Sequence, residues 1–274
     1  MIAAERKAAA EDEGGLRLRR WLNRRCGLHF ADSKAEALLQ RLARIMENFA
    51  ISDFGALARE LERATSGPLV DAVVHAASTN HTYFFREPHV LDYFRDVALA
   101  PRYAVETRIW SAAASTGDEA HTLAIIAAER FGRRQAREKV AILGTDISAA
   151  VLATAEEGVY GAANLEHSPP EIVERYFSKE SETAWRVADD IRSMCLFRRL
   201  NLSVAPYPFQ ERFHIVFCRN VLYYFDQETQ RAVVDAIWDV TEPGGYLFTS
   251  VTVSLRELGS RWSMIQSGVY RKSA

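Results

Sequence analysis

The sequence predicts an α/β protein in which a doubly wound open sheet follows a small all-helical domain and contains a small inserted antiparallel β subdomain. From Arg108 onward, short apolar runs alternate with helical patterns, which is typical of parallel strands joined by crossover helices. This alternation breaks between Tyr176 and Asn201, where two brief β-prone runs flank a charged turn. The patterns upstream are helical, and we expect the boundary between the two domains near residue 80.

The composition is that of a folded globular protein, and it excludes several classes of function. Of the 274 residues, 48% are hydrophobic and 26% are charged. The net charge is −2, so a general nucleic-acid binder is not expected. Three Cys without a C-x-x-C pair argue against a disulfide framework and against a zinc site. No apolar run has the length of a membrane helix and no secretory segment follows Met1, so we expect a cytoplasmic protein without membrane insertion.

The N-terminal domain, residues 14–80, is expected to be helical and basic. Apolar spacing predicts helices over 33–48 and 53–64, the first with Ser33 and Glu36 as a capping box. Residues 14–44 contain eight Lys and Arg and two acidic residues, so positive charge is concentrated here. Arg41 and Arg44 share one face of the first helix, although Glu47 interrupts the basic row. A solvated surface without a partner is the alternative interpretation.

The second domain, residues 81–274, is predicted to contain the sheet. Strands are expected over 108–111, 140–145, 213–218 and 245–250, and an amphipathic helix over 227–241. The inserted β subdomain, at about 178–203, is expected to use residues 185–187 and 195–197 as its strands.

Small residues follow the first predicted strand and lead into a helix, over residues 112–119. Small side chains let a ligand approach the backbone, and the helix start supplies unpaired N–H groups. The run is not G-x-G-x-x-G, and Asp118 and Glu119 would repel a pyrophosphate, so a dinucleotide is disfavoured. The two acids favour a ligand that carries a cation. Their alternative role is to cap the helix start.

Polar residues also follow the other strands of the predicted sheet. Asp146 ends the second strand and can accept two hydrogen bonds from a ribose diol, but it could equally cap the next helix. Together with the small-residue run, it favours a nucleoside that carries positive charge and no phosphates, a description that fits S-adenosylmethionine. Asn201 and Asn220 follow further apolar runs, and each is a weak signal by itself.

Residues 78–89 are richer in polar and aromatic groups than a linker requires, which is typical of a functional loop. Its aromatic residues are predicted to pack in the core. Arg86 either pairs with Glu87 or binds a ligand carboxylate. His81 and His89 lack partners with metal-ligand spacing, so no metal site is expected.

Four segments together resemble the CheR family of chemotaxis receptor methyltransferases, which use S-adenosylmethionine to esterify receptor glutamates. The likeness covers nearly the whole chain. The segments are TNHTYFFREPH at 79–89, WSAAASTGDE at 110–119, GTDIS at 144–148 and FCRNVLYYFD at 217–226.

The resemblance implies a Rossmann-like methyltransferase sheet that binds S-adenosylmethionine and releases S-adenosylhomocysteine. It implies that Arg86 and Tyr224 lie nearest the transferred methyl. It also gives a role to residues 14–44, whose net charge is +6. In that role, Arg41 and Arg44 dock the cytoplasmic helical region of a chemoreceptor. A monomer is expected. The cofactor-binding residues implied by the resemblance are Asn80, Thr82, Arg86, Glu119, Asp146, Asn201, Leu202, Asn220 and Val221.

The chain departs from the family pattern at two places that concern function. Residues 249–252 read Thr-Ser-Val-Thr where family members usually carry Gly-His-Ser-Glu, near the expected acceptor site. This departure supports an alternative function, a non-catalytic S-adenosylmethionine-sensing or scaffold module; a methyltransferase of the same fold acting on RNA or a small molecule is a second alternative. The loop at 178–184 is short and lacks the glycine of members that bind a receptor's C-terminal tail, so we predict a tail-independent enzyme.

Overall fold

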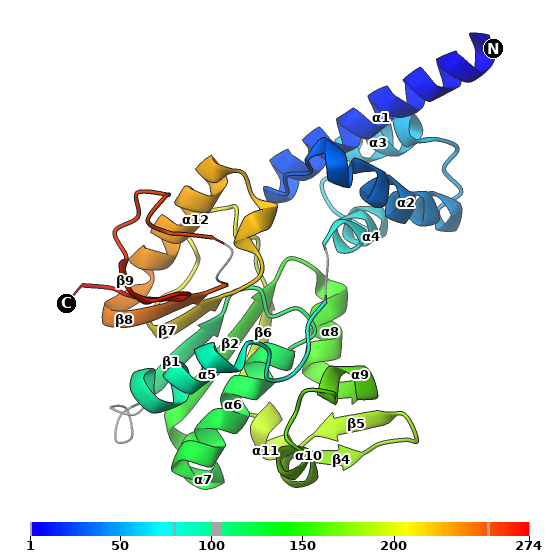
Figure 1. Cartoon of the computed structure of the whole chain (residues 1–274). Coiled ribbons are helices and arrows are strands. Elements are labelled where there is room, and N and C mark those ends of the chain that lie inside the picture. The colour runs from blue at the N-terminus through cyan, green and yellow to red at the C-terminus, as the bar shows by residue number, and fades with distance from the viewer. Residues whose placement is uncertain (1, 79–80, 100–105, 251–252, 274) are drawn as a thin grey trace. The chain divides into compact units, whose positions relative to one another are not determined.

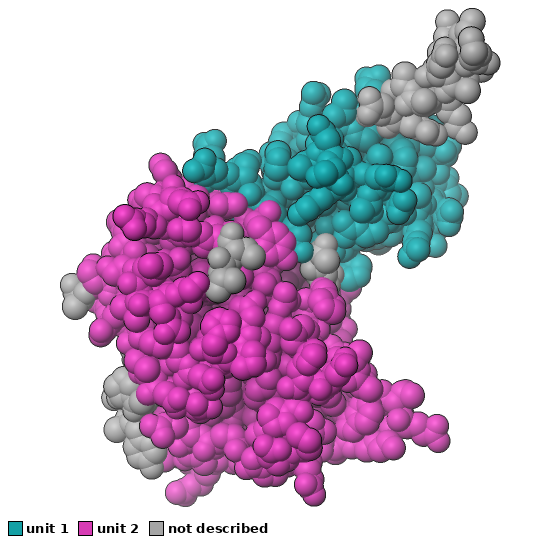
Figure 2. Space-filling view, in the orientation of Figure 1, with its two compact units in different colours: residues 1–79, 224–229 teal, residues 80–223, 230–274 magenta. Residues whose placement is uncertain are grey.

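The computed structural model describes residues 2–78, 81–99, 106–250 and 253–273, and it divides into two compact units. The first unit comprises residues 1–79 and 224–229, and the second comprises residues 80–223 and 230–274. Figure 1 labels the helices and strands, and Figure 2 colours the two units separately.

The first unit is helical. Trp21 of the first helix donates its indole N–H to the Leu61 carbonyl of the third at 3.0 Å, and Leu38 and Leu42 of the second helix are fully buried. Asp53 caps the third helix by accepting a hydrogen bond from the Ala56 N–H at 2.7 Å. The helices are α1 (Ile2–Cys26), α2 (Asp32–Asn48), α3 (Phe54–Arg63) and α4 (Pro68–Ala77).

The predicted capping box at the start of α2 is wrong. The N-cap position is Ala31, which has no side chain able to accept a hydrogen bond, so Ser33 lies inside the helix. Asp32 stands in the first turn instead, where a carboxylate interacts favourably with the helix dipole. It also forms an ion pair of 2.8 Å with Arg19 of α1.

The second unit contains a seven-stranded sheet of order β6-β2-β1-β7-β8-β10-β9. The first five strands in this order are parallel, while β10 is antiparallel to β8 and to β9. The sheet therefore confirms the predicted doubly wound architecture. The strands are β1 (Thr107–Ser111), β2 (Val140–Asp146), β6 (Cys195–Arg199), β7 (Phe213–Cys218), β8 (Thr241–Thr249), β9 (Ser263–Gln266) and β10 (Val269–Arg271).

Helices connect the strands of this unit, and the longest have apolar faces that pack on the sheet. In α12, Val233, Val234 and Ile237 are buried as the spacing predicts, but the helix ends at Asp239, and Thr241 already opens β8. The helices are α5 (Pro88–Tyr93), the π-helical turn η1 (Phe94–Ala98), α6 (Asp118–Phe131), α7 (Arg133–Lys139), α8 (Ala149–Glu157), α9 (Ala162–Leu165), α10 (Pro170–Tyr176), α11 (Asp189–Arg192), the 3-10 turn η3 (Leu222–Tyr224) and α12 (Gln227–Asp239).

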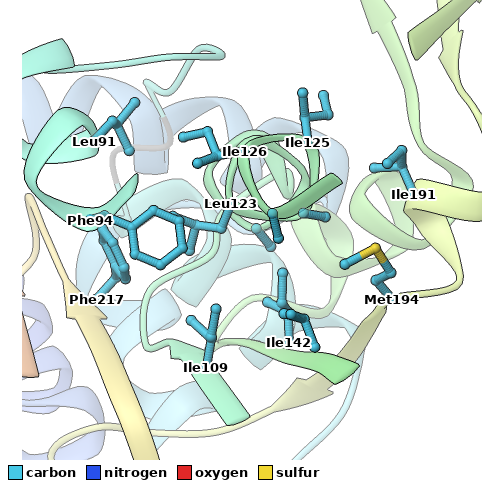
Figure 3. Close-up of a cluster of buried hydrophobic side chains, with 14 of the residues drawn as sticks. Leu91, Phe94, Ile109, Leu123, Ile125, Ile126, Ile142, Ile191, Met194 and Phe217 are labelled. Atoms are coloured by element: carbon cyan, nitrogen blue, oxygen red, sulfur yellow. The ribbon is translucent and has the colours of Figure 1, made fainter. Parts of the chain in front are cut away.

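The core of the second unit lies between the sheet and the helices that cover it. Figure 3 shows Leu123 of α6 above Ile109 of β1 and Ile142 of β2. In the same view Phe94 lies beside Phe217 of β7, and their rings meet edge to face with centroids 5.4 Å apart. This packing fixes α6, whose first turn borders the carboxyl ends of the strands.

A small antiparallel sheet is inserted before β6, but its composition corrects the prediction. Its order is β3-β5-β4, formed by β3 (Val159–Gly161), β4 (Phe177–Lys179) and β5 (Ala184–Val187). Residues 195–197, expected in this subdomain, instead belong to β6 and pair in parallel with β2. The insertion therefore spans 159–187 rather than 178–203, and Figure 1 shows its β4 and β5 as a hairpin.

Strands β9 and β10 were not predicted from the sequence. They are short, and all four residues of β9 are exposed, so their pattern lacks the alternation that identifies a strand.

Among the described residues, no helix combines the length and apolar character needed to cross a bilayer.

Candidate active site

The carboxyl ends of four adjacent strands, β6, β2, β1 and β7, lie at one edge of the large sheet. These strands are parallel, so the residues that follow them gather there. The Ala112 N–H donates to the Phe217 carbonyl at 2.7 Å, and the Ala114 N–H donates to the Thr145 carbonyl at 2.9 Å. The loop after β1 is therefore held against the ends of both neighbouring strands.

Asp146, the last residue of β2, joins this loop to the start of α8. Its Oδ2 accepts a hydrogen bond from the Ser115 N–H at 3.0 Å, and its Oδ1 accepts one from the Ser148 N–H at 2.9 Å. Both bonds orient the carboxylate, which is 9% exposed. Asp146 thus helps to order the start of the next helix, one of its two predicted roles, and also faces the small-residue loop.

Glu119 lies in the first turn of α6, and two neighbouring strands supply its partners. Ser111 Oγ at the end of β1 donates to Glu119 Oε1 at 2.7 Å. Arg219, directly after β7, donates from Nη1 to Glu119 Oε2 at 3.1 Å. Burial raises the pKa of Glu119, and the arginine charge opposes this shift. The carboxylate is nearly enclosed, and this arrangement suits the binding of a cationic group.

Arg86 lies in the loop that precedes α5. Its Nη1 donates to the His81 carbonyl at 2.8 Å, and its guanidinium lies 5.6 Å from the centre of the Tyr83 ring. Its Nε is 4.0 Å from Glu87 Oε1, so the ion pair considered from the sequence is long. The side chain keeps 25% of its surface exposed, which leaves it accessible to a ligand.

Unusual backbone conformations cluster in these loops. Five residues other than glycine have positive φ in the described part of the chain, and four of them belong to the motifs of the site. Such conformations are costly, and they concentrate at functional sites where the surroundings enforce them. The four are Phe85 (58°), Glu87 (58°), Ser115 (49°) and Asn220 (55°).

The inserted sheet supports the loop after β1. Tyr160 of β3 donates from its hydroxyl to the Thr116 carbonyl at 2.7 Å, and Asn164 of α9 donates to Asp118 Oδ1 at 2.8 Å. Gly117, with φ of 89°, has no room for a side chain, because a Cβ would come within 2.7 Å of the Ala155 Cβ. The loop conformation thus depends on residues far along the chain.

Other predicted cofactor residues occupy the same edge. Asn201 follows β6, and its Oδ1 accepts hydrogen bonds from the Ser203 N–H and hydroxyl, while the neighbouring Leu202 is buried. Asn220 Nδ2 donates to Glu87 Oε1 at 3.4 Å. Thr82 and Val221 are half-buried, whereas Asn80 lies outside the described residues.

The remaining predicted residues belong to the first unit. Tyr224 accepts a hydrogen bond at its carbonyl from the His29 N–H at 2.6 Å. On α2, Arg44 is exposed and Arg41 is half-buried, with Arg41 Nε donating to the Ala37 carbonyl at 3.3 Å. The roles of these three side chains stay predictions.

Sequence reasoning did not single out Arg219, Tyr160 or Asn164. Arg219 had a usable signal, because a charged residue directly after a buried apolar strand stands at the ligand edge of an open sheet. Tyr160 and Asn164 had none, since only the fold brings them to the loop.

In the described part of the chain, no group of three His, Cys, Asp or Glu side chains could hold a metal ion.

The mixed sheet, with the Glu119 and Asp146 carboxylates at its parallel carboxyl edge, is the framework of an S-adenosylmethionine-dependent methyltransferase. Two family models match the chain: CheR methyltransferase, SAM binding domain, over residues 80–270, and CheR methyltransferase, all-alpha domain, over residues 15–76. The chain therefore belongs to the CheR family of chemotaxis protein methyltransferases.

Curated relatives agree with this assignment over more than nine tenths of their length. The chain is 31% identical to the chemotaxis protein methyltransferase of Escherichia coli strain K12 over 276 residues, covering 100% of this chain and 95% of the relative. It is 33% identical to chemotaxis protein methyltransferase 1 of Pseudomonas aeruginosa over 253 residues, covering 90% and 92%. The predicted family and cofactor are confirmed.

Proposed function

We propose that this enzyme transfers the methyl group of S-adenosylmethionine to glutamate side chains in the cytoplasmic helical region of chemoreceptors. The products are glutamate methyl esters and S-adenosylhomocysteine. The observation that carries the proposal is the convergence of Asp146, Glu119 and the Arg86 loop at one edge of the sheet, in a chain that matches both domains of the family.

The residues at this edge bind the cofactor by complementary chemistry. Asp146 accepts hydrogen bonds from the ribose hydroxyls, since two backbone N–H groups already orient its carboxylate. Glu119 attracts the cationic end of the cofactor. By resemblance to the family motifs, we also assign cofactor binding to Thr82, Asn201, Leu202, Asn220, Val221 and Asn80.

Catalysis depends on alignment and on electrostatics. A glutamate carboxylate is ionised at pH 7, so in-line attack on the methyl carbon needs no general base. The enzyme must bring a carboxylate oxygen to about 3 Å from that carbon and replace its lost hydration. By resemblance to the family motifs, we assign to Arg86 and to Tyr224 the role of donors to the acceptor carboxylate.

The basic face of α2 docks the receptor. Arg41 and Arg44 are three residues apart on α2, where Arg44 is exposed and Arg41 is half-buried, whereas Leu38 and Leu42 of the same helix are buried. A helical receptor segment rich in acids complements this face, and steering of that kind weakens as salt rises.

The enzyme acts without a receptor tail, as a cytoplasmic monomer. A tail peptide would add a strand to an edge of the small sheet, but the outer strands β3 and β4 have three residues each. The turn between β4 and β5 lacks glycine, and Arg186 braces it by pairing with Glu180 at 2.8 Å. Such a short, braced edge offers few main-chain hydrogen bonds to a peptide.

The test is to incubate the purified enzyme with tritiated methyl donor and receptor-containing membranes. We expect label on the receptor that base hydrolysis releases as methanol, because a carboxylate methyl ester is base-labile. Label that resists base would identify a different acceptor group. Binding of the cofactor without any transfer would support the non-catalytic alternative instead.

A further inference from the structure

Arg219 connects the three segments that build the proposed site. Its side chain is 3% exposed, and it lies directly after β7. Nη1 is 3.1 Å from Glu119 Oε2 in the first turn of α6, and Nη2 is 3.2 Å from Glu87 Oε2 before α5. Nη2 also donates to the Arg86 carbonyl at 2.6 Å. One guanidinium therefore contacts both carboxylates and the backbone of Arg86.

We propose that Arg219 is a positioning residue for methyl transfer, which aims Glu119 at the cofactor and fixes the backbone that presents Arg86 to the acceptor. The proposal rests on the function proposed above for Glu119 and Arg86. Arg219 itself touches neither reacting group, and it acts through these two residues.

The charge of Arg219 favours the ionised form of Glu119 and opposes the effect of burial on its pKa. A buried carboxylate without a cationic partner takes up a proton, and a protonated carboxyl no longer attracts a cation. Besides Arg219, the titratable groups that act on this carboxylate are Glu87 and Cys218. Glu87 raises the pKa of Glu119 further, so Arg219 is the cation that opposes both burial and this second acid.

The shape of the guanidinium fixes the Arg86 loop. The Arg86 carbonyl lies between Phe85 and Glu87, both of which have left-handed backbone conformations with φ of 58°. Residues with side chains hold such conformations only where the surroundings enforce them. The hydrogen bond from Arg219 and its ion pair to Glu87 supply that restraint. A lysine could keep the charge, but a single ammonium cannot reproduce the planar fork.

The experiment compares Arg219→Met with Arg219→Lys, and it measures affinity for S-adenosylmethionine by calorimetry and turnover at saturating cofactor. We expect Arg219→Met to weaken cofactor binding about tenfold and to lower turnover about tenfold beyond that. In Arg219→Lys the retained charge should keep cofactor affinity within about threefold, while turnover stays about tenfold low. This separation of affinity from turnover is the signature of the proposed role.

The control is Arg108→Met, because Arg108 also lies among carboxylates, three of them against two for Arg219, but at the start of β1. It should lower the melting temperature without changing affinity or turnover. If Arg219→Met behaves in the same way, Arg219 is purely structural and the proposal is wrong. If that variant does not fold, Arg219→Met with Glu87→Gln removes one of the two carboxylates that lose their cation, keeps Glu119 and carries the same test.

A further variant, Glu119→Gln, distinguishes failure of this inference from failure of the proposed site. Unchanged cofactor affinity in Glu119→Gln would overturn the site itself. Weakened affinity there, together with wild-type affinity and turnover in Arg219→Lys and Arg219→Met, would overturn only the role of Arg219.

Discussion

In the large sheet, one arginine lies among carboxylates at the amino ends of the strands, and another lies among carboxylates at their carboxyl ends. The two clusters differ in burial and in the segments that they connect. Arg108, at the start of β1, pairs with Glu211 at 3.1 Å and Glu242 at 3.4 Å, and its side chain is 24% exposed. Arg219, directly after β7, is 3% exposed, and it pairs with Glu119 of α6 and with Glu87, whose φ is 58°.

The difference indicates that the amino ends of the strands contribute to stability and that the carboxyl ends contribute to function. At the amino ends of the strands, the ion pairs are partly solvated and contribute little beyond local stability. At the carboxyl ends, a buried guanidinium holds two acids in one geometry at a desolvation cost that stability alone does not explain. Substitutions at the carboxyl end should therefore change function far more than substitutions at the amino end.

The largest effect is expected from Arg86→Ala. Loss of a donor to the acceptor carboxylate should lower turnover about a hundredfold, with a much smaller change in cofactor affinity. Tyr224→Phe tests the second donor in the same way, and it removes only a hydroxyl. Steady-state methylation at saturating cofactor measures both variants. Wild-type turnover in either one would exclude that residue from the mechanism.

Asp146→Ala should have the next largest effect. It removes the acceptor of the ribose hydroxyls and also two hydrogen bonds that order the backbone after β1 and β2. We expect a ten- to hundredfold loss of affinity for both S-adenosylmethionine and its demethylated product, about 1.5 to 3 kcal/mol. Calorimetry with each ligand measures it, and Asp146→Asn is the isosteric control. Unchanged affinity would contradict the assignment.

The basic face of α2 should contribute a smaller and salt-dependent effect. Reversal of Arg41 and Arg44 to Glu should raise the apparent KM for receptor severalfold, without altering cofactor binding. Raised ionic strength should reproduce this loss in the wild type and reduce the difference between the two proteins. Glu47 already interrupts the row, which limits the expected size. Normal methylation by the reversed variant would make the face an ordinary solvated surface.

The hairpin of the inserted sheet should give the smallest effect. Receptors with and without a C-terminal tail should be methylated at similar rates, because β4 offers too short an edge for a tethered peptide to raise the effective concentration. Initial rates with a receptor and its tail-deleted version measure this. A tenfold fall on tail deletion, or micromolar binding of a free tail peptide, would refute tail independence.

The parts that were predictable from the sequence are those where local pattern and function coincide. Strands β1, β2 and β7 are mostly buried, and β2 and β7 contain apolar runs, so their positions were predictable. Asp146 and Asn220 then followed from the rule that ligand residues come after parallel strands. Glu119, after the small-residue run, and Arg86, in a polar loop, were candidates from the residues themselves, and the family motifs then implied that both bind the cofactor.

The parts that were not predictable depend on tertiary context. Residues 195–197 look like any short strand, and only pairing with β2 decides that they extend the large sheet. The same holds for β3, which has three residues and no pattern of its own. The capping box failed because the N-cap is Ala31 and the helix begins at Asp32, two residues earlier than the motif requires.

The hydrogen bonds from the inserted sheet to the loop after β1 bear on protein engineering. Within the insertion, Tyr160 donates a hydrogen bond to the Thr116 carbonyl, and Asn164 donates one to the Asp118 carboxylate. A shortened enzyme that lacks residues 159–187 would keep every strand of the large sheet but lose these two restraints, and buried Asp118 would lose its amide partner. Attempts to build a minimal methyl-transfer module from this chain should therefore retain the insertion, or graft equivalent donors in its place.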